Sequence, residues 1–350
     1  MQKRLLIITQ VVDTNHPILG FFHRWIEEFA KNCEQVHVIA LSVGEYQLPA
    51  NVTVHSLGKE AGENRLKYLW RFYRSIFALR HEYDGVFVHM NQLYVVLGGL
   101  LWRLWGKRIG LWYAHGAVPL SLRVATQLTH IVFTSTPQGF RLPSKKVVVT
   151  GQGIDMSRFV YTPRTASPVL RLCIVGRIAQ SKQIETLIAA CAKLAEARVP
   201  FTFRIVGAAT TPSEKQYEAM LRQQVIASGL SGHIVWYGPA SQAELPALLA
   251  STDIFIHDGV TNSLDKVLVE AVACGVPVVS SNPSYRYIMG TETDWPLFFA
   301  PGDSEALVAN ILELTKRPLF DKNNFTRVAA DRVQQKHSLL NLIAKILRSY

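Results

Sequence analysis

The chain has 350 residues, of which 49% are hydrophobic and 18% charged, which is typical of a folded globular protein and unlike a disordered one. Its formal net charge of +11 lies mostly in the first half, where residues 1–165 hold 19 Lys and Arg against 10 Asp and Glu. A basic half favours an anionic partner such as a membrane surface, a phosphorylated lipid or a nucleotide. Because no nucleic-acid-binding motif accompanies this charge, we do not expect nucleic acid as a partner.

The cysteines and the apolar runs indicate the cellular compartment of the protein. The four cysteines form no CxxC pair and sit in apolar stretches, which predicts buried free thiols, a reducing compartment and no metal site. Met1 leads into an apolar run too short for a secretory signal, and the longest run, Leu93–Trp102, has about half the length of a membrane-spanning helix. We therefore expect a cytoplasmic protein, with peripheral binding at the inner face of a membrane left open.

Short apolar runs typical of strands alternate with helical patterns through the whole chain. In the first half, strands are predicted at residues 5–9, 36–41, 52–56, 85–89, 108–113, 131–135 and 146–150, and helices at 21–32, 66–81 and 94–105. In the second half, strands are predicted at residues 170–175, 201–206, 233–237, 254–257 and 276–280, and helices at 184–197, 213–228, 243–250, 267–274 and 339–349. Such alternation predicts an α/β fold with parallel sheets covered by helices.

A linker is predicted near the middle of the chain, where Pro163 and Pro168 stand among small polar residues. It separates an N-terminal domain, residues 1–163, from a C-terminal domain, residues 164–335. The final helix, within residues 336–350, could cross back to the N-terminal domain. Ligands of doubly wound sheets bind at the carboxyl ends of the strands, so two such domains would face a central cleft that binds a ligand.

Four motifs in a fixed order carry a family resemblance. They are Gly151–Phe159 (GQGIDMSRF), Val175–Ile188 (VGRIAQSKQIETLI), Phe203–Gly207 (FRIVG) and Val267–Ser280 (VLVEAVACGVPVVS). Together they resemble the family 4 glycosyltransferases, and Tyr113–Gly116 (YAHG) matches that family more loosely. The resemblance implies the GT-B fold with two Rossmann-like domains, and an enzyme of polysaccharide biosynthesis. It would transfer a hexose, with retention, from a UDP- or GDP-sugar to a hydroxyl of a glycan or lipid-linked acceptor.

Two cations, Arg177 and Lys182, follow the strand predicted at residues 170–175. Departure of a nucleotide diphosphate builds negative charge on the leaving phosphate, and fixed cations stabilise that charge most in the transition state. The resemblance implies that this pair binds the donor diphosphate. The two cations would take the electrostatic role of a metal, so we expect no metal and no cofactor. The alternative is a pair of solvated loop residues.

Glu270 lies in an otherwise apolar helix, so its carboxylate must be paired or face a ligand. The resemblance implies that it accepts hydrogen bonds from the donor ribose, and the alternative is a carboxylate favoured by the helix dipole. The loop before the helix is expected to bind the donor through its backbone N–H groups. Its residues are Asn262, Ser263, Leu264, Asp265 and Lys266.

This loop departs from the family at several positions. The family usually has Glu at the position of Asn262, where the amide could bind the sugar but carries no charge. Asp265 and Lys266 replace a glycine and an apolar residue, and these changes could compensate for the missing carboxylate or alter the choice of donor. Asp265 is equally well interpreted as a cap of the helix that follows.

The remaining candidate residues lie at predicted strand ends or helix starts. His115 follows a strand, and the resemblance places it near the transferred sugar, where it could donate to a hydroxyl or to developing charge. A satisfied loop histidine is the alternative. Gly20 precedes the first helix and is expected in the acceptor-side loop, although a simple turn fits nearly as well. Gly207 and Gly238 are expected to flank the nucleotide base.

The helix predicted near residues 65–80 is basic and aromatic. Lys67, Arg71 and Arg74 fall opposite its apolar arc, so the helix could face a membrane or the acceptor. We favour the plainer interpretation, in which the apolar arc packs in the core and the basic face is solvated.

Two other functions are compatible with these motifs. A nucleotide-sugar epimerase of GT-B fold would consume a UDP-sugar without an acceptor. A donor-binding partner subunit with weakened catalysis would fit the change at Asn262.

Overall fold

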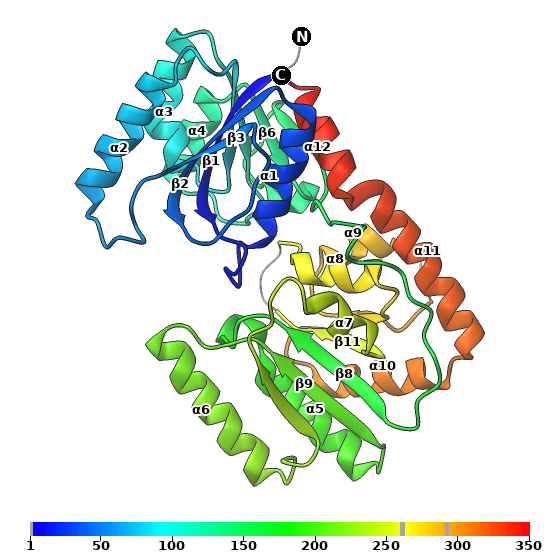
Figure 1. Ribbon diagram of the computed structural model, residues 1–350. Coiled ribbons are helices and arrows are strands. Elements are labelled where there is room, and N and C mark those ends of the chain that lie inside the picture. The colour runs from blue at the N-terminus through cyan, green and yellow to red at the C-terminus, as the bar shows by residue number, and fades with distance from the viewer. Residues whose placement is uncertain (1–2, 260–262, 291–293) are drawn as a thin grey trace. The chain divides into compact units, whose positions relative to one another are not determined.

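Two units divide the chain in the computed structural model (Figure 1). Unit 1 comprises residues 1–155 and 337–350, and unit 2 comprises residues 156–336. Each unit is a parallel sheet covered by helices, so the predicted α/β fold is confirmed. The structure describes residues 3–259, 263–290 and 294–350.

Unit 1 contains a seven-stranded parallel sheet with the strand order β3-β2-β1-β4-β5-β6-β7. Its strands are β1 (Arg4–Val12), β2 (Gln35–Val43), β3 (Val52–Ser56), β4 (Gly85–His89), β5 (Arg108–Trp112), β6 (Ile131–Thr134) and β7 (Val147–Val149). Its helices are α1 (Phe21–Asn32), α2 (Arg65–Ala78), α3 (Leu93–Leu104), α4 (Leu120–Leu128) and α12 (Leu339–Leu347). A short 3₁₀ turn spans Pro137–Gly139.

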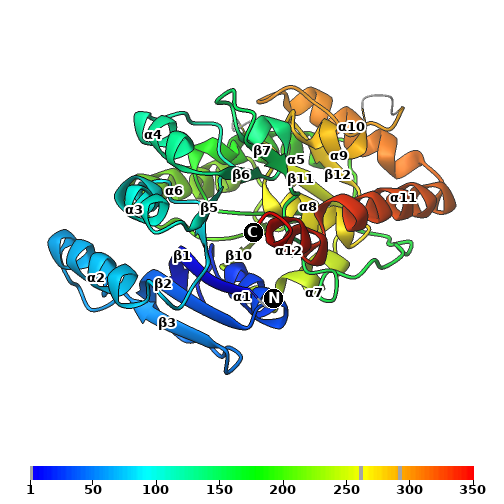
Figure 2. The same cartoon turned by 90° about the horizontal axis from the view of Figure 1, so that it is seen from above.

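Side chains that alternate along β1 fill two separate cores, one on each face of this sheet. Leu5 and Ile7 pack with residues of α1 and α12, whereas Leu6 and Ile8 pack with residues of α2, α3 and α4. Figures 1 and 2 show these two groups of helices on opposite faces of the sheet. Because both faces are covered, the strand is apolar along most of its length.

The helix α12 belongs to unit 1 although unit 2 precedes it in the chain. The backbone N–H of Ile154 donates to His337 O at 2.7 Å, and the N–H of Leu339 donates to Ile154 O at 2.8 Å. Further along, the Tyr350 hydroxyl donates to Val86 O at 2.7 Å. Ile343 of α12 is buried in the core against α1. The last segment of the chain therefore completes one face of the first sheet.

Unit 2 contains a five-stranded parallel sheet with the order β10-β9-β8-β11-β12. Its strands are β8 (Leu170–Val175), β9 (Phe201–Val206), β10 (Ile234–Gly238), β11 (Ile254–His257) and β12 (Val278–Ser280). Its helices are α5 (Ile184–Glu196), α6 (Pro212–Ala227), α7 (Leu245–Ala250), α8 (Lys266–Ala273), α9 (Tyr285–Met289), α10 (Ser304–Lys316) and α11 (Leu319–His337), whose last residue enters unit 1. A short 3₁₀ turn, Gln180–Lys182, precedes α5.

The division between the units lies after Asp155, earlier than the boundary predicted after residue 163. The proline-rich stretch is fixed to unit 2 because the buried Arg164 guanidinium donates to backbone carbonyls there, including Ala250 O at 2.9 Å and Thr252 O at 2.8 Å. Burial lowers the pKa of Arg164. The stretch that contains Pro163 and Pro168 is therefore an ordered segment packed on unit 2 rather than a free linker.

The helix α2 packs differently from the prediction. Phe72 and Ile76 are its buried residues, whereas Leu66 and Trp70 are 77% and 60% exposed. The expected core-facing arc is therefore wrong for these two side chains. Next to α2, the helix α3 contains the longest apolar run of the chain. Among the helices of the described ranges, none is long and apolar enough to cross a bilayer.

Candidate functional site

The sheet of unit 2 changes direction between β8 and β11. From β8 the chain adds strands outward to β10, and from β11 it adds β12 on the opposite side. Loops that leave two such strands diverge, and their carboxyl ends form a ligand-binding crevice in doubly wound folds. Arg177 and Lys182 follow β8, and Asp265 follows β11. The structure therefore places Arg177, Lys182 and Asp265 in the loops that leave these two strands.

Glycines at the strand ends allow the backbone to pass closely here. Gly207 has φ +145°, and a Cβ on it would lie 1.8 Å from the carbonyl oxygen of Gly176. Its N–H donates to Gly238 O at 2.8 Å, which links the ends of β9 and β10. Gly238 has φ +84°, but open space surrounds its missing Cβ. Gly207 thus fits a position that no side chain could occupy.

Replacing Gly207 by alanine is expected to destabilise unit 2 by about 4 kcal/mol, because the new Cβ would overlap the Gly176 carbonyl. The matched control is Gly238→Ala, which meets no neighbour and carries only backbone strain of about 1–2 kcal/mol. Denaturant unfolding of both variants would measure the difference. Equal losses in the two variants would contradict the close approach seen at Gly207.

Lys182 is held by a carboxylate from the neighbouring loop. Its ammonium donates to Asp265 Oδ2, and His257 Nε2 lies 2.8 Å from the same oxygen. His257 Nδ1 lies 3.1 Å from Ser280 Oγ, which in turn accepts from the Asn282 N–H. This pattern is satisfied when Ser280 donates to Nδ1 and His257 Nε2–H donates to Asp265. The loops after β8, β11 and β12 are thereby tied together.

The charge of Asp265 is stabilised in this network. Burial opposes its ionisation, but the hydrogen bond from His257 and the charge of Lys182 outweigh burial and lower the pKa of Asp265. Asp265 occupies the N-cap position of α8, yet its side chain makes no capping hydrogen bond to the helix within the described residues. The predicted cap through the Asp265 side chain is therefore not formed, and the carboxylate contacts Lys182 instead, a contact that was not predicted.

Arg177 is positioned by Glu214 at the start of α6. Its guanidinium Nη1 lies 2.9 Å from Glu214 Oε1, and half of the arginine side chain is exposed. Glu214 Oε2 accepts from the N–H and hydroxyl of Thr210, within a capping box that includes Thr211. These hydrogen bonds, with the charge of Arg177, lower the pKa of Glu214 to about 2. Arg177 therefore presents a fixed positive charge beside Gly176.

Glu270 is buried in the middle of α8, with 2% of its side chain exposed. The ammonium of Lys266, one turn earlier, lies 3.5 Å from Oε1, and this oxygen accepts no hydrogen bond within the described residues. Burial raises the pKa of Glu270 although the charge of Lys266 opposes the shift. A carboxylate that is buried and incompletely satisfied is costly to keep, which favours a role beyond folding.

The rest of the predicted donor loop is only partly described. Asn262 lies outside the described residues. Ser263 accepts a hydrogen bond at its backbone oxygen from Asn282 Nδ2 at 2.8 Å, and Leu264 is buried. These two residues therefore fix the loop to the segment after β12. Lys266 faces Glu270, as described above.

The candidate residues of unit 1 are Gly20, which follows β1, and His115, which follows β5. Gly20 has an ordinary φ of −57°, and a Cβ on it would lie 2.7 Å from His16 O, so the loop itself requires this glycine. His115 is exposed, and its Nδ1 accepts from the Ala117 N–H at 3.1 Å, which leaves Nε2 as the donor of the neutral ring. His89 ends β4 but is buried, stacked 3.9 Å from the Phe22 ring.

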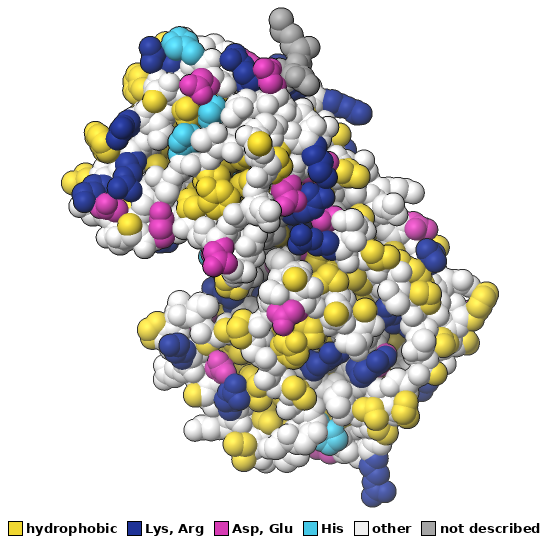
Figure 3. Space-filling view, in the orientation of Figure 1, with side chains coloured by type: hydrophobic (Ala, Val, Ile, Leu, Met, Phe, Trp, Pro, Cys, Tyr) yellow, Lys and Arg dark blue, Asp and Glu magenta, His cyan; other side chains and the backbone are white. Residues whose placement is uncertain are grey.

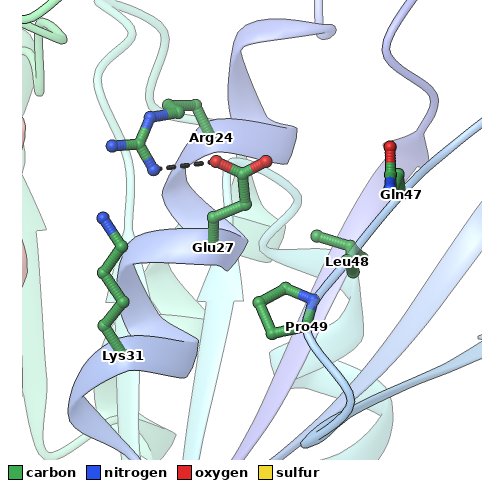
Figure 4. A pocket seen from close by; sticks show the side chains of 6 residues that line it. All are labelled: Arg24, Glu27, Lys31, Gln47, Leu48 and Pro49. Carbon is green, nitrogen blue, oxygen red and sulfur yellow. Dashed lines mark hydrogen bonds and ion pairs between the residues drawn. The ribbon is translucent and has the colours of Figure 1, made fainter.

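A shallow hollow of about 500 Å³ also opens on unit 1, between α1 and the segment before β3 (Figure 4). Its charged side chains are largely matched. Arg24 contacts Glu27 at 2.8 Å and Asp155 at 2.8 Å, and Lys31 contacts Glu28 at 3.0 Å. The hollow contains none of the predicted site residues.

Two site residues were missed by the sequence analysis. His257 directly follows the buried run Ile254–Ile256, and a polar residue at such a strand end is a usable signal for a ligand site. Glu214 gave no comparable signal, because its helix-start position is explained by the capping box alone.

A family model and several sequence relatives match part of this chain. Residues 165–331 match the family described as glycosyl transferases group 1. AmsK of Erwinia amylovora, an amylovoran biosynthesis glycosyltransferase, is 30% identical over 184 residues, which cover 50% of this chain and 43% of AmsK. WcaL of Salmonella typhimurium, named for colanic acid biosynthesis, is 28% identical over 183 residues, which cover 50% of this chain and 43% of WcaL. The match spans less than half the length of either relative.

Solved structures resemble the whole chain. Anabaena HepE, in complex with UDP and glucose, has a TM-score of 0.75 and 19% identity and covers 99% of both chains. Sucrose-phosphate synthase of Thermosynechococcus elongatus has a TM-score of 0.78 and 15% identity, covering 99% of this chain and 98% of its own. At such low identity these likenesses show the fold alone, which is GT-B. Residues 165–331 of this chain are thus similar to the group 1 glycosyl transferases.

Proposed function

We propose that this protein transfers a hexose, with retention of configuration, from a nucleotide-diphosphate sugar to a hydroxyl of a glycan or lipid-linked acceptor. Its donor is a UDP- or GDP-sugar, and the reaction needs no resident metal. The protein takes part in the biosynthesis of a polysaccharide in the cytoplasm.

The observation that carries this proposal is the placement of two cations where the unit 2 sheet changes direction. Arg177 and Lys182 follow β8, and Lys182 contacts Asp265 at the start of α8. A diphosphate bound there would meet two positive side chains and the N-terminal N–H groups of α8. Cations and N–H groups in this arrangement stabilise the leaving diphosphate without a metal ion.

The relatives support the choice of substrates. HepE was solved with UDP and glucose and also with UDP-glucose, so UDP is the first nucleotide to test. AmsK and WcaL are named for the biosynthesis of polysaccharides, amylovoran and colanic acid. His115 of unit 1, whose Nε2–H is available to donate to a hydroxyl, is the residue that would contact the sugar hydroxyls.

The first test is calorimetric titration of the full chain with UDP, GDP, ADP and CMP, in the presence of EDTA. We expect one nucleoside diphosphate to bind, and Arg177→Ala to weaken it by about 1.5–3 kcal/mol, as expected for charged hydrogen bonds. Arg222→Ala is the matched control. It removes an arginine that is 48% exposed and paired with Glu218 at 2.7 Å, much as Arg177 is paired with Glu214.

Absence of binding by all four nucleotides at millimolar concentration would overturn the donor site. Equal losses in Arg177→Ala and Arg222→Ala would also contradict it, because the effect would then belong to the fold of α6 rather than to the phosphate contact.

A further inference from the structure

The outer surface of α2 and α3 exposes large apolar side chains that a core-packed helix would bury. Leu66, Trp70 and Phe77 lie on one stripe of α2, at intervals of one and two helical turns, and all are exposed. On α3, Leu100 and Leu104 are 62% and 73% exposed. We call these five side chains the apolar stripe of the α2–α3 face.

The two helices form one continuous surface. The Tyr73 hydroxyl of α2 donates to Leu97 O of α3 at 3.1 Å. The rings of Phe77 and Trp105 meet edge to face with centroids 5.0 Å apart. Figures 1 and 2 show α2 and α3 side by side on one face of the unit 1 sheet. The exposed residues of both helices therefore belong to one patch.

This patch carries charge of one sign. The helices α2, α3 and α4 contain no Asp or Glu, and the chain has none from residue 85 to residue 154. The patch and its border hold five arginines that make no ion pair within the described residues. They are Arg65, Arg74, Arg80, Arg103 and Arg123. Figure 3 shows basic and apolar side chains next to one another over α2.

Two acidic residues that border α2, Glu63 and Asp84, are paired with cations. Glu63 contacts Lys67 at 2.6 Å and Arg71 at 3.1 Å. Asp84 contacts Arg4 at 2.9 Å. The guanidinium of Arg74 lies over the Trp70 ring, 5.2 Å from its centroid, so a positive charge and an exposed indole are presented together.

We propose that the α2–α3 face docks unit 1 onto the surface of an anionic lipid bilayer. Leucine, phenylalanine and tryptophan side chains would enter the boundary between headgroups and acyl chains, where an indole is favoured. The unpaired guanidinium groups would bind lipid phosphates through forked hydrogen bonds. An anionic bilayer fits this face better than a protein partner, because the helices α2, α3 and α4 carry charges of one sign only. The proposal does not depend on the identity of the sugar donor.

The test is co-sedimentation of the full chain with vesicles of phosphatidylcholine alone and of phosphatidylcholine with phosphatidylglycerol. We expect binding to the anionic vesicles only, weakened by added salt because each basic group interacts with the surface charge. Leu66→Ser with Trp70→Ser should weaken binding by more than about tenfold, through loss of inserted apolar surface. Arg65→Glu with Arg74→Glu should also weaken it by more than about tenfold.

Matched controls come from unit 2. Phe320→Ser removes an aromatic side chain that is 74% exposed, and Lys215→Glu reverses an exposed charge on α6, so neither should change vesicle binding. Thermal melting of every variant checks that it is folded. Failure to bind anionic vesicles, equal binding to neutral ones, or equal losses in the controls would each overturn the proposal. A dimer that Trp70→Ser dissociates would instead assign this face to a second copy of the chain.

Discussion

Lys182→Ala is expected to lower the rate of sugar transfer by roughly 100- to 1,000-fold, the effect of removing one preorganised group that stabilises charge in a transition state. Lys182 is the cation that the loop after β11 holds in place, through Asp265. Without the Lys182 ammonium, Arg177 would be the one cation of this pair left to stabilise the departing diphosphate. Steady-state kinetics with the nucleotide sugar found by calorimetry would measure the effect mainly in kcat.

Asp265 gives this prediction a sharper form. The single variant Asp265→Ala keeps the Lys182 ammonium but removes the carboxylate that holds it in position. We therefore expect about a tenfold loss of kcat, smaller than the loss in Lys182→Ala. The double variant should be no slower than Lys182→Ala, because a positioning residue has no effect once the positioned group is gone. Lys182→Ala should also cost about 2 kcal/mol of stability, which Asp265→Ala partly restores by removing the carboxylate left without its cation.

Additive kinetic losses in the double variant would contradict a positioning role and would give Asp265 a direct part in the reaction. A Lys182→Ala protein that transfers sugar at nearly the normal rate would remove Lys182 from the mechanism. Melting measured on the same samples separates both outcomes from simple unfolding.

Glu270→Gln is expected to stabilise the fold while weakening donor binding. The carboxylate is buried and its Oε1 accepts no hydrogen bond within the described residues, so a neutral amide of the same shape should gain about 1 kcal/mol. The ribose hydroxyls of the proposed donor would lose a charged hydrogen-bond acceptor, which should weaken nucleotide binding by about 1.5–3 kcal/mol. A substitution that raises stability and lowers function is characteristic of a residue kept for its ligand.

The gain from Glu270→Gln depends on pH. The pKa of Glu270 is raised in the folded state, so the folded protein binds the proton more tightly than the unfolded chain does. Below the pKa of Glu270 in the unfolded chain, the side chain is protonated in both states and does not destabilise the fold. As pH rises from that value to the folded pKa, the ionised carboxylate lowers the stability of the fold by a growing amount. The difference in stability between the variant and the natural protein should thus be small in acid and largest near neutral pH.

Denaturant unfolding at several pH values would measure this difference, with Glu196→Gln as the control. Glu196 is an exposed glutamate at the end of α5, and its substitution should change stability by less than about 0.5 kcal/mol at any of these pH values. A Glu270→Gln protein that is less stable at neutral pH would mean that the carboxylate is well satisfied in solution.

The parallel sheets could be predicted because strands buried on both faces are apolar without interruption, as Ile254–Ile256 shows. The helices α4, α9, α10 and α11 were not predicted. The helix α11 explains why, since it is polar on most of its surface and buries few apolar side chains. These include Ala329, Ala330 and Val333. Helices of this kind are specified by the surface they cover and not by their own periodicity.

The site could be predicted only where chemistry and spacing coincide. Arg177 and Lys182 follow a strand at a motif's spacing, whereas the contacts of Lys182 with Asp265 and of Arg177 with Glu214 join distant parts of the chain. Periodicity also failed on α2. It groups Leu66 and Trp70 with the apolar residues, but it does not reveal which stripe of a helix meets the sheet.

The return of α12 to the first sheet has a consequence for biosynthesis. One face of unit 1 is completed by residues that the ribosome adds only after all of unit 2 has been made. Until then, buried side chains of α1 such as Trp25 lack part of their cover. The usual order, in which the N-terminal domain matures first, is therefore reversed, and unit 2 can finish folding while unit 1 still waits for its last helix.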